Sequence, residues 1–148
     1  MTLAQVIKTM KEIAAQQPAV SLIIDNDIYR LNATPDATYG VFAYTQGQHT
    51  GNVDGSLHRF AFTLFYVDRL NEDHSNEIEV QSVGVQVLET ILRAMSDAGI
   101  FAGDYSVNTF TQRFLDDCAG AFASTTFEVP FDTLCVDDYE QISNDTEG

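Results

Sequence analysis

Three histidines are the side chains of this sequence best suited to metal or acid–base chemistry. His49, His58 and His74 each lie in or beside an expected loop, and no two of them have the i, i+3 or i, i+4 spacing that places two ligands on one helical face. Asp116 and Asp117 could share a proton as a general acid–base pair, but a solvated turn explains these neighbours better. We therefore expect no metal, no cofactor and no catalytic residue.

Other short patterns point to turns and packing. Residues 25–27 and 52–55 contain the residue types of calcium loops, but neither has the glutamate six positions after the glycine that completes an EF-hand. The glycines of residues 99–103 follow a helix and precede a strand, which is the wrong order for a phosphate loop. Cys118 and Cys135 have no His or Cys at metal spacing, and we expect reduced structural thiols.

Composition narrows the class of protein. The 148 residues include 22 acidic and 7 basic side chains, a net charge of −15, and 45% of them are hydrophobic. So acidic a chain is repelled by phosphates, which argues against nucleic acid or an anionic membrane as a partner. We find neither a membrane span nor a secretion signal, and expect synthesis in the cytoplasm and one globular domain.

Two amphipathic helices are predicted. The first begins with a capping box of Thr2 and Gln5 and ends before Pro18. The second spans residues 76–98, with a capping box of Asn76 and Glu79, seven apolar side chains at helical spacing, and Gly99 as a left-handed end.

β-Branched apolar runs and period-two apolar patterns predict the strands. The polar segment at 45–56, which has three glycines and only one aliphatic side chain, predicts an exposed loop. Apolar side chains on both faces of the strand at 58–67 indicate a central position. A turn or bulge is expected at 115–120. The expected strands are 20–24 and 28–31 as a hairpin, 39–44, 58–67, 104–114 and 121–131.

This order predicts an α+β fold, a mostly antiparallel sheet of about five to six strands with two helices packed on one face. Residues 1–131 form the single domain, and residues 132–148, with six acidic and no basic side chains, form an acidic tail. The 10 Phe and 6 Tyr are many for this length and favour self-association, although ordinary core packing also accounts for them.

The sequence resembles small neck and tail-completion proteins of tailed bacteriophages, those of crAss-like phages above all. The likeness extends over nearly the whole chain. It rests on the order of the helices and strands and on the general character of the sequence. Its segments are FAFTLFYVDRL (60–70), residues 75–95, DDCAGAF (116–122) and TFEVP (126–130).

The resemblance implies a non-enzymatic virion protein with a tail-terminator or head–tail connector fold. Such a protein forms a ring of six or twelve copies between portal or connector and tail tube, with DNA only passing through an acidic channel, and it needs no cofactor and no membrane. The 45–56 loop and the tail would make subunit or ring contacts. The candidate contact residues are Gln48, His49, Asn52, Val53, Asp54, Asp132, Leu134, Asp137 and Tyr139.

Two other functions stay open. A pocket between the sheet and the long helix, lined by Tyr66, His58 and Asp68, would make the chain a small-molecule-binding or enzymatic domain. The charge alone would also fit an acidic DNA mimic that inhibits a nucleic-acid enzyme.

Overall fold

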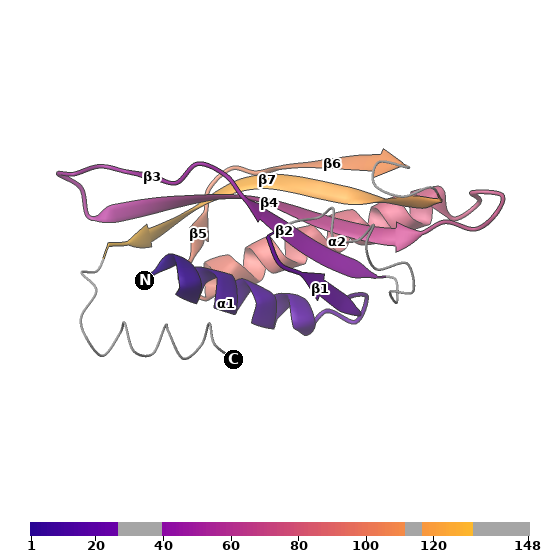
Figure 1. Ribbon diagram of the computed structural model, residues 1–148, viewed down its shortest axis with the longest axis horizontal. Helices are drawn as coiled ribbons and strands as arrows, with labels where there is room; N and C mark the ends of the chain where they lie inside the picture. Colours follow the sequence, from indigo (N-terminus) through magenta and orange to yellow (C-terminus); the bar gives the residue numbers. More distant parts are fainter. Residues whose placement is uncertain (27–39, 112–116, 132–148) are drawn as a thin grey trace.

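A computed structural model describes residues 1–26, 40–111 and 117–131. They form two layers, an elongated twisted sheet with two helices on one of its faces (Figure 1). The predicted α+β fold, with a mostly antiparallel sheet, is confirmed. The expected tail at 132–148, the strand at 28–31 and Cys135 lie outside the described residues.

Helix α1 (Leu3–Ala15) has the predicted capping box. The backbone N–H of Gln5 donates to Thr2 Oγ1 over 3.3 Å, and the N–H of Thr2 donates to Gln5 Oε1 over 2.8 Å. The pairing satisfies two amides that the first helical turn leaves without a carbonyl partner. Its buried stripe of Val6, Met10 and Ala14 faces the sheet.

Helix α2 (Glu77–Asp97) begins where the sequence predicts. The predicted capping box of Asn76 and Glu79 is wrong, because the Asn76 side chain makes no capping hydrogen bond. The Asn76 side chain faces the preceding loop, where its Oδ1 accepts from the Asn71 N–H (2.8 Å) and its Nδ2 donates to the Arg69 carbonyl (3.3 Å). The negative charges of Glu77 and Glu79 in the first turn stabilise the helix because they lie near the positive end of its dipole. The left-handed conformation predicted for Gly99 is present, with φ +84°.

Within the described residues the sheet has seven strands, where about five to six were expected. Its centre is the antiparallel pair of β4 and β7, each of 13 residues and joined along their full length. The path across the sheet is β1-β2-β4-β7-β5, with β3 added to β4 and β6 to β7. The strands are β1 (Leu22–Ile24), β2 (Val41–Gln46), β3 (Thr50–Gly51), β4 (Leu57–Arg69), β5 (Phe101–Ala102), β6 (Ser106–Thr111) and β7 (Cys118–Pro130).

Two sequence expectations change in the structure. β1 pairs in parallel with β2, and the strand at 28–31, with which it was expected to form a hairpin, lies outside the described residues. The expected 104–114 strand is preceded by the separate strand β5, and both of them pair with β7. β7 starts at Cys118, within the expected 115–120 turn, because the ladder with β4 continues to Arg69.

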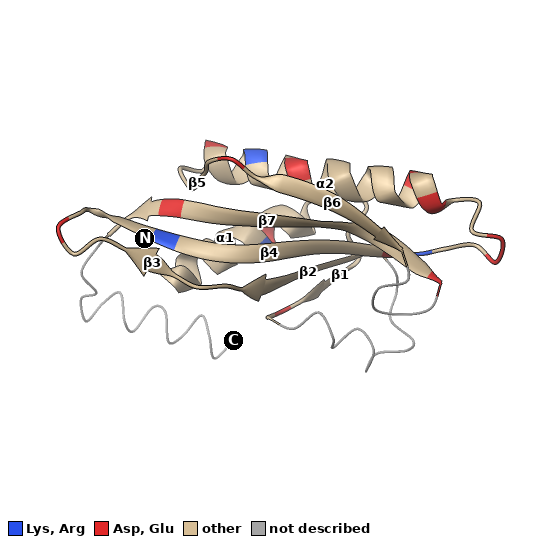
Figure 2. Ribbon diagram, turned by 90° about the horizontal axis from the view of Figure 1, so that it is seen from above, with Lys and Arg blue, Asp and Glu red and all other residues tan. Residues whose placement is uncertain are grey.

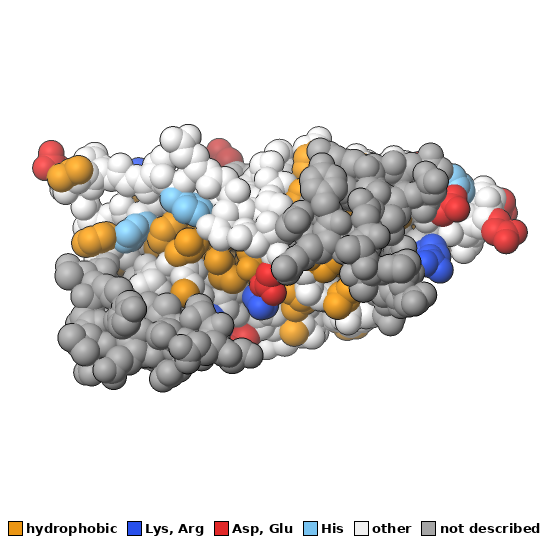
Figure 3. Space-filling model, in the orientation of Figure 1, with side chains coloured by type: hydrophobic (Ala, Val, Ile, Leu, Met, Phe, Trp, Pro, Cys, Tyr) orange, Lys and Arg blue, Asp and Glu red, His pale blue; other side chains and the backbone are white. Residues whose placement is uncertain are grey.

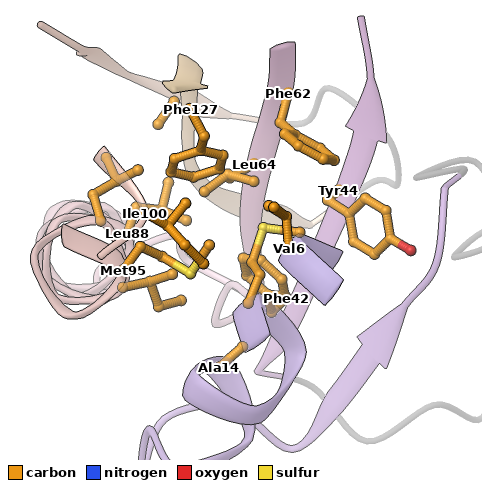
Figure 4. Packing of buried hydrophobic residues seen from close by; sticks show 14 of the residues in the cluster. Val6, Ala14, Phe42, Tyr44, Phe62, Leu64, Leu88, Met95, Ile100 and Phe127 are labelled. Atoms are coloured by element: carbon orange, nitrogen blue, oxygen red, sulfur yellow. The ribbon is translucent and has the colours of Figure 1, made fainter. Parts of the chain in front are cut away.

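The main core lies between the sheet and the helices (Figure 4). Alternate residues of β4 point into it, and Gly84 lets α2 lie close to the sheet, since a Cβ there would come 3.1 Å from the Cβ of Ala121. The other face of β4 carries a smaller buried cluster, which confirms the central position. That second cluster contains Ile24, Val41, Ala43, Phe65, Val67, Phe110 and the buried thiol Cys118.

Asp25 ties three elements together at the end of β1. Its Oδ1 accepts a hydrogen bond from the Tyr44 hydroxyl (2.7 Å), and the same oxygen lies 2.9 Å from Lys11 Nζ. Burial, then the hydrogen bond and the negative charge of Asp25, raise the pKa of Tyr44 above its ordinary value of 10.0. The neutral phenol of Tyr44 thus links β2 to Asp25, which also forms an ion pair with Lys11 of α1.

Candidate functional site

The segment expected as an irregular loop at 45–56 is largely a hairpin that extends beyond one end of the sheet (Figure 1). Thr45 and Gln46 close β2, and the two residues of β3 pair with His58 and Arg59. We call β3, the turn 52–56 and residues 57–59 the hairpin arm. The arm brings the predicted contact residues Asn52, Val53 and Asp54 together at its tip, and Gln48 and His49 lie just before β3.

Asn52 organises the turn at the tip. Its carbonyl accepts from the Gly55 N–H (2.9 Å), and its side-chain oxygen accepts from the Asp54 N–H (3.2 Å). Such side-chain turns fix the backbone of short polar segments. Val53 is fully exposed at the end of the arm, although exposing an aliphatic side chain to water is unfavourable. The hydrogen-bonded turn therefore holds an apolar side chain in an exposed position.

His49 joins the arm to the body of the sheet. Its Nδ1 accepts from the N–H of Ala61 (3.3 Å), so Nε2 carries the proton and donates to Gln46 Oε1 (2.9 Å). The imidazole also stands edge-on to Phe60, with ring centroids 5.4 Å apart. In this arrangement His49 is a structural bridge whose two nitrogens are both used.

An open aromatic groove lies at the base of the arm, with a volume of about 540 Å³. His58 packs between the rings of Phe60 and Phe131, at centroid distances of 5.1 and 4.6 Å. Phe131 is more than half exposed, and its N–H donates to the Ser56 carbonyl over 2.7 Å, which fixes the end of β7 beside the arm. Figure 3 shows histidine and hydrophobic side chains gathered over this half of the molecule.

Sequence reasoning missed Phe131 and Phe60 as parts of this groove. The alternation of His58, Phe60 and Phe62 along one face of β4 was the available signal, since it continues the core pattern beyond the helices. Phe131 could not be found that way, because it reaches the groove from the other end of the chain. The predicted contacts Asp132, Leu134, Asp137 and Tyr139 lie outside the described residues.

The arm and its surroundings are nearly uncharged. Residues 41–67 contain one acidic and one basic side chain, Asp54 and Arg59, in a chain of net charge −15. Arg59 Nε lies 3.0 Å from Glu128 Oε1 across the β4–β7 pair, so its charge is balanced locally (Figure 2). The acidic excess thus lies elsewhere, for example in residues 68–79 with five acidic and one basic side chain.

The expected small-molecule pocket behind the sheet is absent from the described part of the chain. The space between sheet and helices is filled by the main core, with Tyr66 almost wholly buried. Tyr66 and Asp68 do meet: the phenol lies within hydrogen-bond distance of Asp68 Oδ2 (3.4 Å) and the Ala19 carbonyl (3.3 Å). His58 precedes Tyr66 by eight residues on β4, which places the two residues about 26 Å apart at the usual rise of a strand.

Burial, followed by the charge and hydrogen bond of Asp68, raises the pKa of Tyr66 above 10.0. A phenol with this shift stays protonated and is a poor general base near neutral pH. Tyr66 and Asp68 therefore form a structural pair at the edge of the core.

The three histidines form no common site: His49 and His58 line the aromatic groove, and His74 lies apart from them. His74 pairs with Asp117 (3.1 Å) at the far end of the sheet, and Asp116, the other half of the expected carboxylate pair, lies outside the described residues. Within the residues that the structure describes, no cluster of three or more His, Cys, Asp or Glu could hold a metal ion. The site that the structure does build is therefore a surface of apolar and aromatic side chains.

Comparison of the sequence with models of known protein families gives no match, and comparison with curated proteins gives none either. Neither of the described helices has the length and apolar character needed to cross a membrane. The fold and the hairpin arm with its exposed valine are the observations that bear on function.

Proposed function

We propose that this chain is a structural ring subunit in the neck or tail of a tailed bacteriophage, a tail terminator or head–tail connector. One observation carries the proposal: a hairpin arm with a fully exposed valine, whose two charged side chains Asp54 and Arg59 have opposite signs, extends from a strongly acidic body. Exposed apolar side chains on an ordered support are typical of protein–protein contacts. In this role the chain lies in the virion, bound to copies of itself and to portal or connector and tail-tube proteins.

The charge distribution supports a ring around DNA. Six copies at −15 each repel one another, so contacts between them form most easily where both surfaces are uncharged. The acidic side chains that remain outside the contacts repel phosphates, so DNA in the central channel passes without adhering. The arm lies at one end of the elongated sheet, from which it can reach a neighbouring copy (Figure 1).

Static light scattering coupled to size exclusion, followed by negative-stain microscopy of the peak, tests the proposal. We expect a concentration-dependent species of six or twelve copies, seen as an annulus with a central channel. The chain mass of 16.4 kDa makes monomer and hexamer easy to separate. A monomer at every concentration, unchanged by chemical cross-linking, would contradict the ring function.

A further inference from the structure

A second uncharged surface lies on the helical layer. An open groove of about 430 Å³ separates the end of α1 from the middle of α2, and all its lining side chains are uncharged. Val83, on the outer side of α2, is more than one-third exposed. The lining includes Pro18, Ala19, Ser82, Val83, Gln86 and Thr90.

The outer face of α2 explains why this groove is unusual. Residues 80–88 contain no charged side chain, whereas acidic residues lie in the first turn and charged ones again near the end (Figure 2). An exposed helix face in a soluble protein ordinarily carries charges. Here the polar positions Gln86 and Thr90 bond within the helix, with Thr90 Oγ1 donating to the Gln86 carbonyl over 2.7 Å. These side chains therefore leave a surface suited to contact with another apolar surface.

We infer that the hairpin arm of one copy docks, through Val53, into the α1–α2 groove of the next copy. The inference rests on the proposed ring function and names its interface. The occupant follows from charge: a basic partner protein would be drawn to the acidic segments, whereas another copy of this −15 chain is repelled everywhere except at its uncharged surfaces. The groove brings no charged side chain to this contact, and the tip brings one, the exposed Asp54 beside Val53, which can stay in solvent at the rim of the contact.

The position of the two surfaces sets the symmetry. The arm extends past one end of the sheet, whereas the groove is formed by the opposite end of α1 and the middle of α2 (Figure 1). Different patches on the two partners make a head-to-tail contact, which repeats from copy to copy and closes into a ring when the rotation allows. A two-fold contact of arm against arm would instead stop at a dimer.

Two variants separate these arrangements. Val53→Asp removes the apolar tip and keeps the groove, and Val83→Glu charges the groove and keeps the tip. Each variant alone should remain a monomer under conditions in which the wild type assembles. A one-to-one mixture should give a dimer and nothing larger, because the intact tip of Val83→Glu fills the intact groove of Val53→Asp and the remaining surfaces are both blocked. Light scattering on the mixture measures this mass directly.

Controls keep the result interpretable. Asn108→Asp adds one negative charge at an exposed position of β6, outside both surfaces, and should assemble like the wild type. Gln86→Glu, at an exposed helical position, charges the groove without removing a packed side chain and should reproduce Val83→Glu if that variant folds poorly. Wild-type rings together with assembled Val53→Asp or Gln86→Glu would overturn this interface alone. A wild type that never assembles would overturn the ring function and the interface with it.

Discussion

Gly120 in β7 faces the backbone carbonyl of Tyr66 in β4 so closely that a Cβ at Gly120 would overlap the carbonyl oxygen. The two longest strands therefore approach each other at this point only because residue 120 has no side chain. Alanine there must force the strands apart, at a cost of about 3 kcal/mol, the upper end of the usual range for overpacking. Chemical denaturation of Gly120→Ala measures the loss. Gly103→Ala, which meets no atom within 4 Å, is the matched control, and an equal effect of both variants would refute this steric explanation.

Thr125 is a buried polar side chain in β7 whose hydroxyl has no hydrogen-bond partner among the described residues. Valine has almost the same shape and no hydroxyl to desolvate, so Thr125→Val should raise the free energy of unfolding by about 1 kcal/mol. Thr126→Val tests the same replacement at the adjacent exposed position and should change little. A loss of stability in Thr125→Val would show that the hydroxyl is satisfied in solution.

Alkaline pH should weaken the fold through two tyrosines. The pKa values of Tyr44 and Tyr66 are raised above 10.0, mainly by burial and further by Asp25 and Asp68, so above that pH the unfolded chain binds fewer protons than the folded one. The free energy of unfolding must then fall as the pH rises from about 9 to 11. The Tyr44→Phe and Tyr66→Phe double variant should show a shallower fall over the same range. Equal slopes for the variant and the wild type would contradict the raised pKa values.

His49 should exist as the tautomer with its proton on Nε2, because Nδ1 accepts from the Ala61 amide. Nitrogen NMR of the imidazole distinguishes the two tautomers. The hydrogen bond should also protect the Ala61 amide from exchange with solvent, and a His49→Ala variant should lose that protection. A proton found on Nδ1 would disprove the assignment.

Added salt should strengthen self-association. Copies of a −15 chain repel one another, and salt screens that repulsion while leaving contacts between uncharged surfaces intact. Raising sodium chloride from about 0.05 to 0.5 M should therefore shift the mass distribution towards the ring. An acidic DNA mimic would behave in the opposite way towards its basic partner, since salt weakens that attraction. Sedimentation velocity over the salt series separates the two behaviours.

The sequence predicted the elements whose signals are local. α2 was found because seven apolar side chains keep one helical period, and β4 because Phe60, Phe62, Leu64 and Tyr66 alternate on one face. Asn76 was misread as a cap because the same side chain can satisfy either helix or loop amides, and only the folded loop decides. The parallel pairing of β1 and the two-residue strand β3 are set by distant partners.

The candidate site was half predictable for the same reason. The arm tip was found from its glycines and polar residues, which signal a turn whatever surrounds them. The aromatic groove brings together His49, His58 and Phe131, and no spacing within the sequence reports that distance. The uncharged groove between α1 and α2 depends on how the two helices pack and has no sequence pattern of its own.

The full-length pairing of β4 and β7 has a consequence for synthesis in the cell. Residues 70–117 separate the two strands, which is several seconds of translation at about 5–20 residues per second, and pairing of such distant segments is intrinsically slow. During that interval β4 has left the ribosome with its phenylalanines uncovered and its central hydrogen-bonding edge open. The nascent chain is therefore most prone to aggregate before β7 emerges, and any chaperone that assists it should act in that window.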